Sequence, residues 1–324
     1  MVFAGAPLWA EPLRIATFHT DASRKGPGLL LRDILRGDDP QITAVQDTII
    51  QADADIIVVQ DFDFDLRATA LNAFADTLAA RGLSYPHRFT RPTNAGRQSG
   101  LDLNADGRLG DADDAQGYGR FYGAGGMAIL SRFPIVGNEV EDYTALLWRD
   151  LPDNIYPQVD GAPFGGAQVH AAQRLSSKGH WIVPVATPDH GTVRVMTFHA
   201  APPVFDGAED RNGRRNHDEA AFWLDYLARA DSALPFVLLG VANMDPDRGQ
   251  GRPEAIRALL THPQLQDPFP DTPTADFDDP DPGDLRVDYL LPSSDWKVEN
   301  FGTIRTPSAS RHDLLWADLE RRDP

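Results

Sequence analysis

The sequence predicts a layered α/β protein built around two packed sheets, and three observations lead to this prediction. Segments with strand-like and helix-like patterns alternate over the first 82 residues, which is typical of layered α/β proteins. Further strand-like segments continue as far as residue 316, and no low-complexity linker separates them. The composition is that of a globular chain, with 42% hydrophobic and 24% charged residues among 324. We therefore expect residues 11–324 to form a single domain that buries its core without disulfides.

The first four predicted elements are a strand, a helical region, a second strand and a helix. Residues 13–18 are rich in β-forming side chains and follow a proline. Residues 27–51 carry apolar side chains at helical spacings, and residues 55–60 form the continuous apolar run of a buried strand. Residues 66–82 are predicted as a helix, because they have an apolar face and end at a glycine.

The rest of the chain adds six predicted strands, one helix and two long loops. The strands are short apolar or alternating segments, at residues 126–131, 181–185, 193–198, 236–239, 287–291 and 314–316. The helix covers residues 216–230. Residues 92–118 and 265–284 are rich in Gly, Pro and Asp and are expected to be surface loops.

Charge and cysteine content exclude several classes of function. The net charge of −18 opposes tight binding of nucleic acid or anionic lipid. The chain has no cysteine, which excludes thiolate zinc sites, iron–sulfur clusters and a cysteine nucleophile. It also has no run of 18 or more apolar residues, so we predict no membrane span. The oligomeric state is not predicted.

Residues 1–10 are small and apolar and precede a polar stretch. This pattern resembles the end of a secretory signal, with residues 7–10 as the cleavage region. The alternative is an apolar tail of no targeting role. We favour the remnant of an export signal, which predicts a periplasmic or secreted protein.

The first long loop contains the pattern of a twelve-residue calcium loop, from Asp102 to Asp113. Asp102, Asn104 and Asp106 stand at the first, third and fifth positions, and a glycine for the sharp turn comes next. Arg108 stands at the seventh position, where the backbone carbonyl is a ligand. Asp113 closes the loop in place of the usual Glu. The spacing predicts Ca²⁺ in a structural role; the alternative is an Asp/Gly turn that binds nothing.

Six polar residues stand at or near the ends of predicted strands, where α/β folds assemble their sites. They are His19, Asp61, His199, Asn243, Asp288 and His312. Such carboxylates, amides and imidazoles can hold a hard divalent cation and activate water against a phosphate ester. Taken singly, each has an ordinary explanation as a turn former or a structural histidine.

The order of these segments resembles the endonuclease/exonuclease/phosphatase superfamily. The matching segments are 13–19 (LRIATFH), 54–63 (ADIIVVQDFD), 128–135 (AILSRFPI), 195–199 (VMTFH), 239–246 (LGVANMDP), 286–293 (RVDYLLPS) and 310–318 (SRHDLLWAD). Residues 202–219 also resemble exported bacterial members. The resemblance implies a DNase I-like fold, a four-layer α/β/β/α sandwich of two mixed sheets flanked by helices. It also implies metal-assisted hydrolysis of phosphodiesters or phosphomonoesters.

Four positions depart from the pattern that the resemblance implies. His19 replaces an asparagine and Asp61 a glutamate, and both remain possible metal ligands. Val241 replaces the aspartate of a Gly-Asp-x-Asn motif, although Asn243 is kept. Arg311 replaces the aspartate of a Ser-Asp-His motif.

The residues that match keep the roles that the resemblance implies. His199, Asn243, Asp288 and His312 are the expected catalytic residues. The metal would be Mg²⁺ or Mn²⁺, and the imidazole of His19 favours Mn²⁺ or Zn²⁺ over Mg²⁺.

Two hypotheses about activity remain. The first is a metal-dependent phosphoesterase with a remodelled metal site, acting on a small phosphate ester. The second is a catalytically inactive, exported binding or structural protein with Arg311 in the former metal site. The two hypotheses differ over Arg311, whose guanidinium can bind a phosphate or pair with Asp288 or Asp61.

Several neighbouring charges have weaker predictions. Asp63 and Asp65 would share a face with Asp61 if the strand continued. Lys178 and His180 lie just before the strand predicted at 181–185 and could face the site, although a solvated loop is the simpler interpretation. The cluster of Arg211, Arg214 and Arg215 is expected to receive a phosphate or to pair with Asp206, Glu209 or Asp210.

Overall fold

The computed structural model describes residues 11–230, 234–278 and 282–322. Residues 1–10, the expected remnant of an export signal, lie outside these ranges. None of the helices within the described ranges is both long and apolar enough to cross a membrane.

Two mixed β-sheets form the centre of the molecule. The larger sheet has the order β14 (Trp296–Ile304), β15 (Leu314–Arg321), β1 (Leu13–His19), β2 (Ile56–Phe62), β4 (Gly126–Ser131), β3 (His87–Phe89). The smaller sheet has the order β13 (Asp288–Pro292), β10 (Phe236–Val241), β9 (Gly191–His199), β8 (His180–Thr187), β5 (Glu141–Asp142). Strands β1 and β2 are parallel, as are β9 and β10, so both sheets are mixed as predicted.

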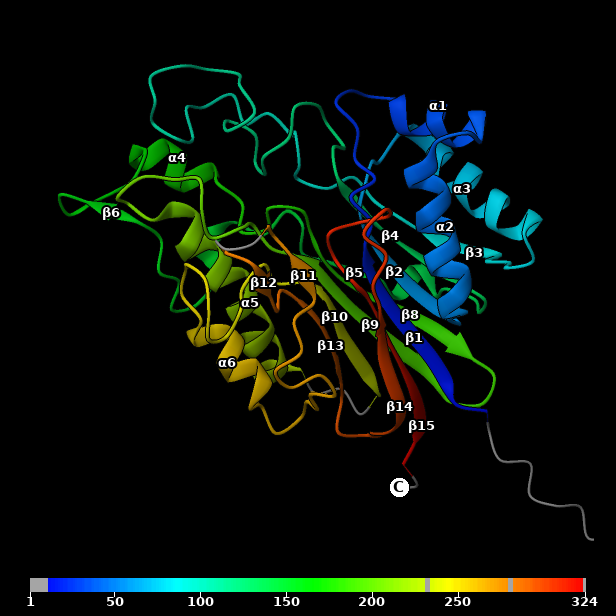
Figure 1. Ribbon diagram of the computed structural model, residues 1–324. Helices are drawn as coiled ribbons and strands as arrows, with labels where there is room; N and C mark the ends of the chain where they lie inside the picture. The colour runs from blue at the N-terminus through cyan, green and yellow to red at the C-terminus, as the bar shows by residue number, and fades with distance from the viewer. Residues whose placement is uncertain (1–10, 231–233, 279–281, 323–324) are drawn as a thin grey trace, which may run out of the picture.

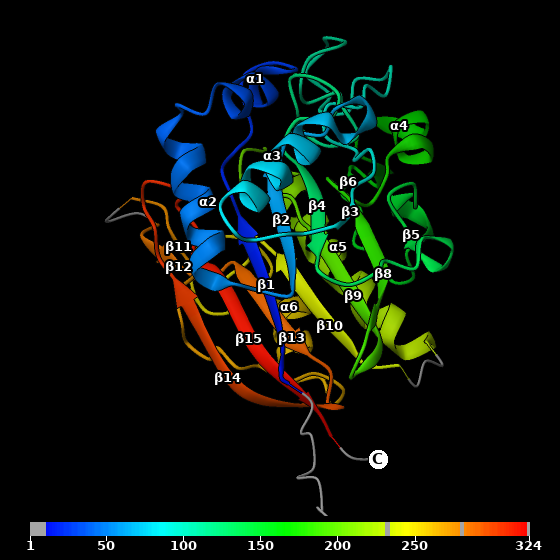
Figure 2. The same cartoon turned by 90° about the vertical axis from the view of Figure 1, so that its right-hand side faces the viewer.

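Helices cover the outer face of each sheet. Figure 1 shows α1 (Leu29–Arg36), α2 (Pro40–Ala52) and α3 (Thr69–Ala80) on one side, and α5 (Arg211–Arg229) and α6 (Glu254–Leu260) on the other. Figure 2 looks onto α1–α3, which lie over the larger sheet. The short α4 (Gly166–Ala172) stands beside the pair β6 (Gln158–Val159) and β7 (Ala162–Pro163), and β11 (Ala275–Asp276) pairs with β12 (Asp284–Leu285).

Three apolar cores separate these layers. One joins α1–α3 to the larger sheet, one joins α5 and α6 to the smaller sheet, and the third lies between the sheets. In the third core Ile15 and Val58 of one sheet belong to the same buried cluster as Val195 and Leu239 of the other. The predicted four-layer α/β/β/α sandwich is therefore confirmed.

Two predicted helices begin at different residues from those expected. The helix predicted from residue 66 starts at Thr69, because Arg67 and Ala68 adopt left-handed conformations, with φ of 69° and 53°. A 3-10 turn (Leu66–Ala68) precedes it, and the Asp65 carboxylate accepts a hydrogen bond from the N–H of Ala70 at 3.0 Å. The helix predicted at 216–230 starts five residues earlier, at Arg211.

One end of the two sheets carries the predicted site residues. Register pairs Gln60 with His19 in the larger sheet and Val241 with both His199 and Asp288 in the smaller sheet. The finishing ends of β1, β2, β9 and β10 therefore lie at the same end as the start of β13. The 92–118 loop lies at this end too, because the N–H of Asn94 donates to the carbonyl of Lys178 at 2.9 Å (Figure 1).

Candidate functional site

The structure brings three of the predicted histidines, His19, His199 and His312, into one group, which we call the histidine cluster. The rings of His19 and His312 are stacked with centroids 4.0 Å apart, and the rings of His19 and His199 are 5.1 Å apart. All three residues are at least nine-tenths buried. His19 and His312 come from the larger sheet and its approach loop, and His199 from the smaller sheet, so the cluster spans both sheets.

Left-handed backbone conformations concentrate around this cluster. Asp21, Asp61 and Asn243 have φ of 48°, 53° and 52°, respectively. Such conformations are unfavourable for non-glycine residues by about 1 kcal/mol or more, although Asp and Asn tolerate them best. At each of these three residues the backbone departs from the extended conformation of a strand.

His312 and Asp288 form a buried pair that crosses from one sheet to the other. The Asp288 Oδ2 lies 2.8 Å from the His312 Nδ1. Thr274, which the sequence did not indicate, donates its hydroxyl to the same Oδ2 at 2.9 Å. Burial alone would lower the pKa of His312, but the charge of Asp288 and the hydrogen bond to it outweigh burial and raise this pKa.

The other two histidines of the cluster are neutral and have unpaired nitrogens. Burial, reinforced by the charge of His312, lowers the pKa of His19 to about 3. Burial also lowers the pKa of His199 well below its usual value. The Nδ1 atoms of both rings are buried and have no hydrogen-bond partner. A neutral imidazole with a free nitrogen can serve as a metal ligand or accept a proton.

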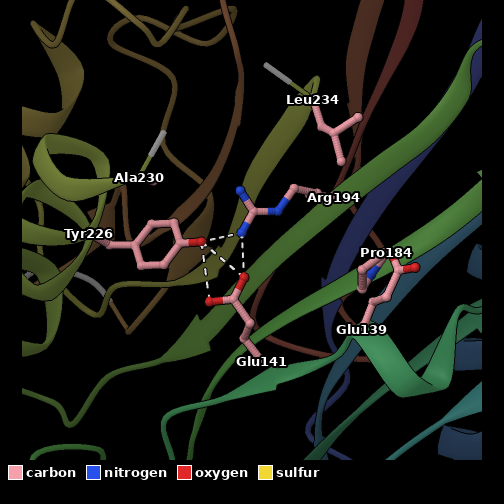
Figure 3. Close-up of a pocket in the computed structure, with 7 residues that line it drawn as sticks. All are labelled: Glu139, Glu141, Pro184, Arg194, Tyr226, Ala230 and Leu234. Carbon is pink, nitrogen blue, oxygen red and sulfur yellow. Dashed lines mark hydrogen bonds and ion pairs between the residues drawn. The ribbon is translucent and has the colours of Figure 1, made fainter. Parts of the chain in front are cut away.

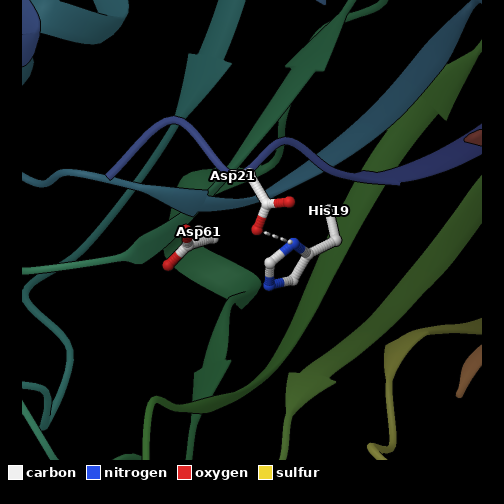
Figure 4. A group of neighbouring side chains, drawn as sticks. All are labelled: His19, Asp21 and Asp61. Carbon is white, nitrogen blue, oxygen red and sulfur yellow. Dashed lines mark ion pairs between the residues drawn. The ribbon is translucent and has the colours of Figure 1, made fainter. Parts of the chain in front are cut away.

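His19, Asp21 and Asp61 form a group that fits a divalent cation. One donor atom from each lies within 4.8 Å of the others. In Figure 4 the Asp21 Oδ1 faces the His19 Nδ1, 3.4 Å away, with Asp61 beside them. Burial raises the pKa of Asp61, and a bound cation would offset that cost. The predicted ligands His19 and Asp61 therefore lie together, and Asp21 joins them.

Gly125 lets the side chains of Asp61 and Lys178 lie close to its backbone, where a side chain of its own would collide with them. It has φ of 51°, and a Cβ added there would lie 2.2 Å from the Asp61 Oδ1 and 3.1 Å from the Lys178 Nζ. The Nδ1 of His19, which has no hydrogen-bond partner, and the carboxylates of Asp21 and Asp61 together fit the divalent metal that the resemblance implies.

Lys178 brings a positive charge next to Asp61, so the simpler prediction of a solvated loop was wrong. Its Nζ lies 3.4 Å from the carbonyl of Ala124, and removal from water lowers its pKa against the attraction of Asp61. His180 points elsewhere: its ring nitrogens meet the hydroxyl of Ser176 at 2.5 Å and the carbonyl of Glu219 at 2.8 Å.

Arg311 lies at the rim of the site and does not fill it. Its side chain is 58% exposed, its Nε is 3.7 Å from the Asp21 Oδ2, and its guanidinium lies over the ring of Phe277 at 5.6 Å. The predicted pairing with Asp288 or Asp61 and the predicted plug of the metal site were therefore wrong. The backbone N–H of Arg311 and the hydroxyl of Ser310 each donate to the Asp21 Oδ2 at 3.0 Å.

Val241 occupies the centre of the smaller sheet's part of the site. It is fully buried and pairs in register with His199 on one side and Asp288 on the other. An aspartate at this position would have placed a carboxylate between them, and valine removes it. Asn243 is kept, but its Nδ2 donates to the carbonyl of Ala200 at 2.8 Å.

Asp63 and Asp65 have structural partners and do not join the group around Asp61. Asp63 accepts hydrogen bonds from the Ser23 hydroxyl at 2.6 Å and from the N–H groups of Arg24 and Gly125. Asp65 begins α3. The suggestion that they contribute to the metal site was therefore wrong.

The basic cluster on α5 is structural. Arg211 donates to the carbonyl of Leu103 at 2.7 Å, and Arg214 donates to the carbonyls of Glu209 and Ile155. Arg215 is buried and donates to four backbone carbonyls, of Leu175, Gln116, Arg174 and Ser176. The predicted pairing with Asp206, Glu209 or Asp210 side chains was wrong: these arginines hold loops in place.

In the predicted calcium loop, side-chain oxygens already accept bonds from loop N–H groups. Asp102 accepts from Asp106 and Gly107 at 3.1 and 2.8 Å, and Asn104 accepts from Asp106 at 3.3 Å. The Asp106 Oδ1 accepts from the N–H of Arg108 at 2.8 Å. These hydrogen bonds fit both the predicted calcium loop and its alternative, an Asp/Gly turn that binds nothing.

Asp114, next to the predicted closing residue Asp113, is the buried carboxylate of this loop. It accepts hydrogen bonds from the N–H groups of Leu103 at 2.8 Å and Gly110 at 2.6 Å. Burial raises the pKa of Asp113, which donates its own N–H to the Asp111 Oδ1. The sequence pattern did not indicate Asp114.

A cavity of about 360 Å³ lies at the opposite end of β9 from His199 (Figure 3). It surrounds Arg194, whose guanidinium is 2.6 Å from the Glu141 Oε1 and also bonds the Tyr226 hydroxyl. Arg194 and Glu141 form an ion pair at this cavity, and none of the residues that line it belongs to the histidine cluster.

Comparisons with known proteins agree with the fold. The sequence profile of the Endonuclease/Exonuclease/phosphatase family matches residues 32–312. No curated protein matches the chain. An endonuclease/exonuclease/phosphatase from Beutenbergia cavernae has a similar structure, with a TM-score of 0.60 and 20% identity, covering 96% of this chain and 72% of that one.

Two further solved structures are similar over their whole length. The mannosyl-6-phosphatase Bt3783 of Bacteroides thetaiotaomicron has a TM-score of 0.52 and 14% identity, covering 95% of this chain and 99% of that one. Sphingomyelinase C of Streptomyces griseocarneus has a TM-score of 0.52 and 16% identity, with the same coverages. At these identities the similarity shows the DNase I-like fold alone. With the profile match over most of its length, the chain belongs to the Endonuclease/Exonuclease/phosphatase family.

Proposed function

We propose that the protein is a metal-dependent phosphoric ester hydrolase whose cation is held by His19, Asp21 and Asp61. The observation that supports this most directly is the position of these three ligands beside the His312–Asp288 pair, since the rings of His19 and His312 are 4.0 Å apart. When bound, the cation would supply Lewis-acid polarisation of a phosphoryl oxygen.

The chain's own residues divide the remaining tasks. His312, whose pKa is raised by the charge of Asp288 and the hydrogen bond to it, can donate a hydrogen bond to a phosphoryl oxygen. The ammonium of Lys178 adds a positive charge beside Asp61, and Arg311 offers a second one at the rim. With Val241 in place of an acid, we assign the acceptance of a proton from water to the imidazole of His199, whose ring centroid lies 5.1 Å from that of His19.

The substrate that fits best is a small phosphate ester. The net charge of −18 repels long polyanions, whereas a single phosphoryl group needs only the local charges of the site. The similar structure of a mannosyl-6-phosphatase supports a phosphomonoester as the first substrate to test.

The test is a panel of an aryl phosphomonoester, an aryl phosphodiester and plasmid DNA, each with Mg²⁺, Mn²⁺, Zn²⁺ and Ca²⁺ after metal removal. We expect turnover of the aryl esters, faster with Mn²⁺ or Zn²⁺ than with Mg²⁺, because an imidazole ligand favours these ions. The variant His19→Asn should shift the preference towards Mg²⁺, and His262→Asn, outside the histidine cluster, should not. No turnover under any condition would show that the hydrolase proposal is wrong.

The burial of Val241 favours a second candidate, a family member that binds a phosphate ester without hydrolysing it. The isopropyl group cannot orient or deprotonate water at the position between His199 and Asp288. Binding of inorganic phosphate without turnover in the panel would select this candidate.

We also propose that residues 102–113 bind Ca²⁺ in a structural role. The side-chain oxygens of Asp102 and Asn104 both accept from the N–H of Asp106, so they lie close together in one turn. A bound cation would stabilise this arrangement of oxygens. Millimolar Ca²⁺ should raise the melting temperature of the wild type and not that of the double variant Asp102→Asn/Asp106→Asn. The absence of a shift in the wild type would refute calcium binding.

A further inference from the structure

Glu219 is a buried carboxylate on the inward face of α5, and the proposed function does not use it. Its side chain is 0% exposed. The Oε1 accepts a hydrogen bond from the N–H of Ser177 at 2.5 Å, and the Oε2 accepts one from the N–H of Ala201 at 2.7 Å. A buried carboxylate held in this way fixes both donors, because moving either one leaves a buried charge with fewer partners.

The two donors belong to the segments that carry Lys178 and His199. Ser177 directly precedes Lys178, and Ala201 follows His199 by two residues. The Ser177 hydroxyl also donates to the carbonyl of His199 at 3.0 Å. The two backbone segments that carry Lys178 and His199 are therefore both held by one carboxylate.

Asn216, one turn earlier on the same face of α5, extends this arrangement to a third segment. Its Nδ2 donates to the carbonyls of Ala201 and Ala242, both at 2.6 Å. Ala242 lies between Val241 and Asn243. Glu219 and Asn216 thus join the three loops on the smaller sheet's side of the site.

The charged and titratable groups around Glu219 come from three elements. Arg215 lies on α5 and directs its guanidinium to backbone carbonyls. Lys178 precedes β8, and its ammonium is attracted to Glu219. His180, on β8, is bonded to the carbonyl of Glu219 at 2.8 Å. Within the described residues, the carboxylate of Glu219 has hydrogen bonds only to Ser177 and Ala201.

We propose that Glu219 is a positioning residue, which holds the Lys178 ammonium and the His199 imidazole in fixed places relative to Asp61. What these two groups then bind rests on the function proposed above, whereas the positioning itself does not.

The test compares Glu219→Gln with Asp218→Asn. Glutamine keeps one acceptor and turns an amide N–H₂ towards the other donor, so it loses one of the two bonds. Asp218 is the matched control, because it is equally buried on the same helix. It accepts from the indole of Trp148 at 2.6 Å and the N–H of Ile155 at 2.9 Å, away from the histidine cluster.

The NMR signals of the lysine side chains provide the first measurement. A general loss of stability would not shift the signal of Lys178 selectively. The chain has three lysines, Lys25, Lys178 and Lys297, so a sample labelled with ¹³C-lysine shows three sets of side-chain signals. Lys178→Met assigns the signal of interest. Glu219→Gln should shift the Lys178 signal and leave the other two in place, while Asp218→Asn should lower the melting temperature and shift none of the three.

Titration with inorganic phosphate gives the second readout. We expect Glu219→Gln to weaken phosphate binding about tenfold, and Asp218→Asn to leave it unchanged. If the wild type does not bind phosphate, the function proposal fails and the Lys178 signal still tests the positioning. An unmoved Lys178 signal in Glu219→Gln would overturn the inference. Should Glu219→Gln not fold, Glu219→Asp replaces it, since it keeps the charge but is too short to reach both donors.

Discussion

The two sheets contribute half of the site each, and the two halves differ in which groups of the family pattern they keep. The half from the larger sheet, His19, Asp21 and Asp61, departs from the family pattern by substitutions that keep nitrogen and oxygen donors within 4.8 Å of one another. The half from the smaller sheet keeps His199 and Asp288 but has Val241 between them.

The difference separates two tasks that metal-dependent hydrolases combine. A cation tolerates an exchange of imidazole for amide, because both offer a lone pair. Proton transfer from water does not tolerate an exchange of carboxylate for an alkyl group. In the proposed function, the larger sheet's half therefore supplies ion binding, while the smaller sheet's half lacks the carboxylate that the family pattern would supply for proton transfer.

The largest effect should come from the pair that joins the two halves. Asp288→Asn removes the charge that raises the pKa of His312, and we expect kcat on an aryl phosphate to fall about 10³-fold. Steady-state kinetics at pH 7 measures this. Retention of more than a tenth of the activity would mean that His312 has no part in the reaction.

Restoring the aspartate of the family pattern at position 241, in the smaller sheet's half, should raise kcat. Val241→Asp places a carboxylate between His199 and Asp288, and we expect kcat to rise about 100-fold. The same change should lower the stability by about 2–3 kcal/mol, because a buried carboxyl replaces an apolar side chain. Val237→Asp, buried on the same strand, serves as the control and should only destabilise. An unchanged kcat for Val241→Asp would contradict the proposal that the smaller sheet's half lacks a carboxylate for proton transfer.

The pH dependence of stability should sharpen the assignment of Glu219. Burial raises its pKa to about 7 from 4.5. A carboxyl with a higher pKa in the folded chain contributes stability that is fully present below pH 4.5 and is lost as the pH rises through 7. Relative to Glu219→Gln, the wild type should therefore lose about 2–3 kcal/mol of unfolding free energy over this range. Denaturant unfolding at several pH values measures it, and parallel curves for the two proteins would contradict the raised pKa.

The smallest effect is expected at the rim of the larger sheet's half. Arg311→Ala removes a 58% exposed side chain whose nearest carboxylate oxygen is 3.7 Å away. Stability should change by no more than about 0.5 kcal/mol. The Michaelis constant for an aryl phosphate should rise about threefold, because one exposed cation is lost. A larger rise in the constant would place Arg311 in direct contact with the substrate.

Strand positions and the main site residues were predictable because they depend on apolar runs and on the polar residues at the ends of those runs. The eight predicted strands all appear, and β4 (Gly126–Ser131) has the predicted bounds. Strand β14 (Trp296–Ile304) was not predicted, since it is an edge strand with several exposed polar residues. The histidine cluster was predictable from the strand ends, whereas Asp21 was not, because it lies two residues beyond β1 in a left-handed turn.

The inward face of α5 shows why other parts of the site escaped prediction. Helix prediction relies on an apolar stripe, but the first half of α5 buries Arg211, Arg215, Asn216, Asp218 and Glu219. These side chains bind loop carbonyls and N–H groups, so their pattern reflects hydrogen bonding across the fold. The preference for a solvated loop at Lys178 was wrong for a related reason: sequence alone does not show that Asp61, 117 positions earlier, is its neighbour.

Gly125 has a consequence for comparing this chain with its relatives. It carries no charge, yet its missing methyl group sets how near the Asp61 carboxylate and the Lys178 ammonium can come. The interaction between these two charges therefore depends partly on an uncharged residue, Gly125. A survey of relatives confined to acids, bases and histidines would overlook it, and an alanine there would mark a protein in which this interaction has changed.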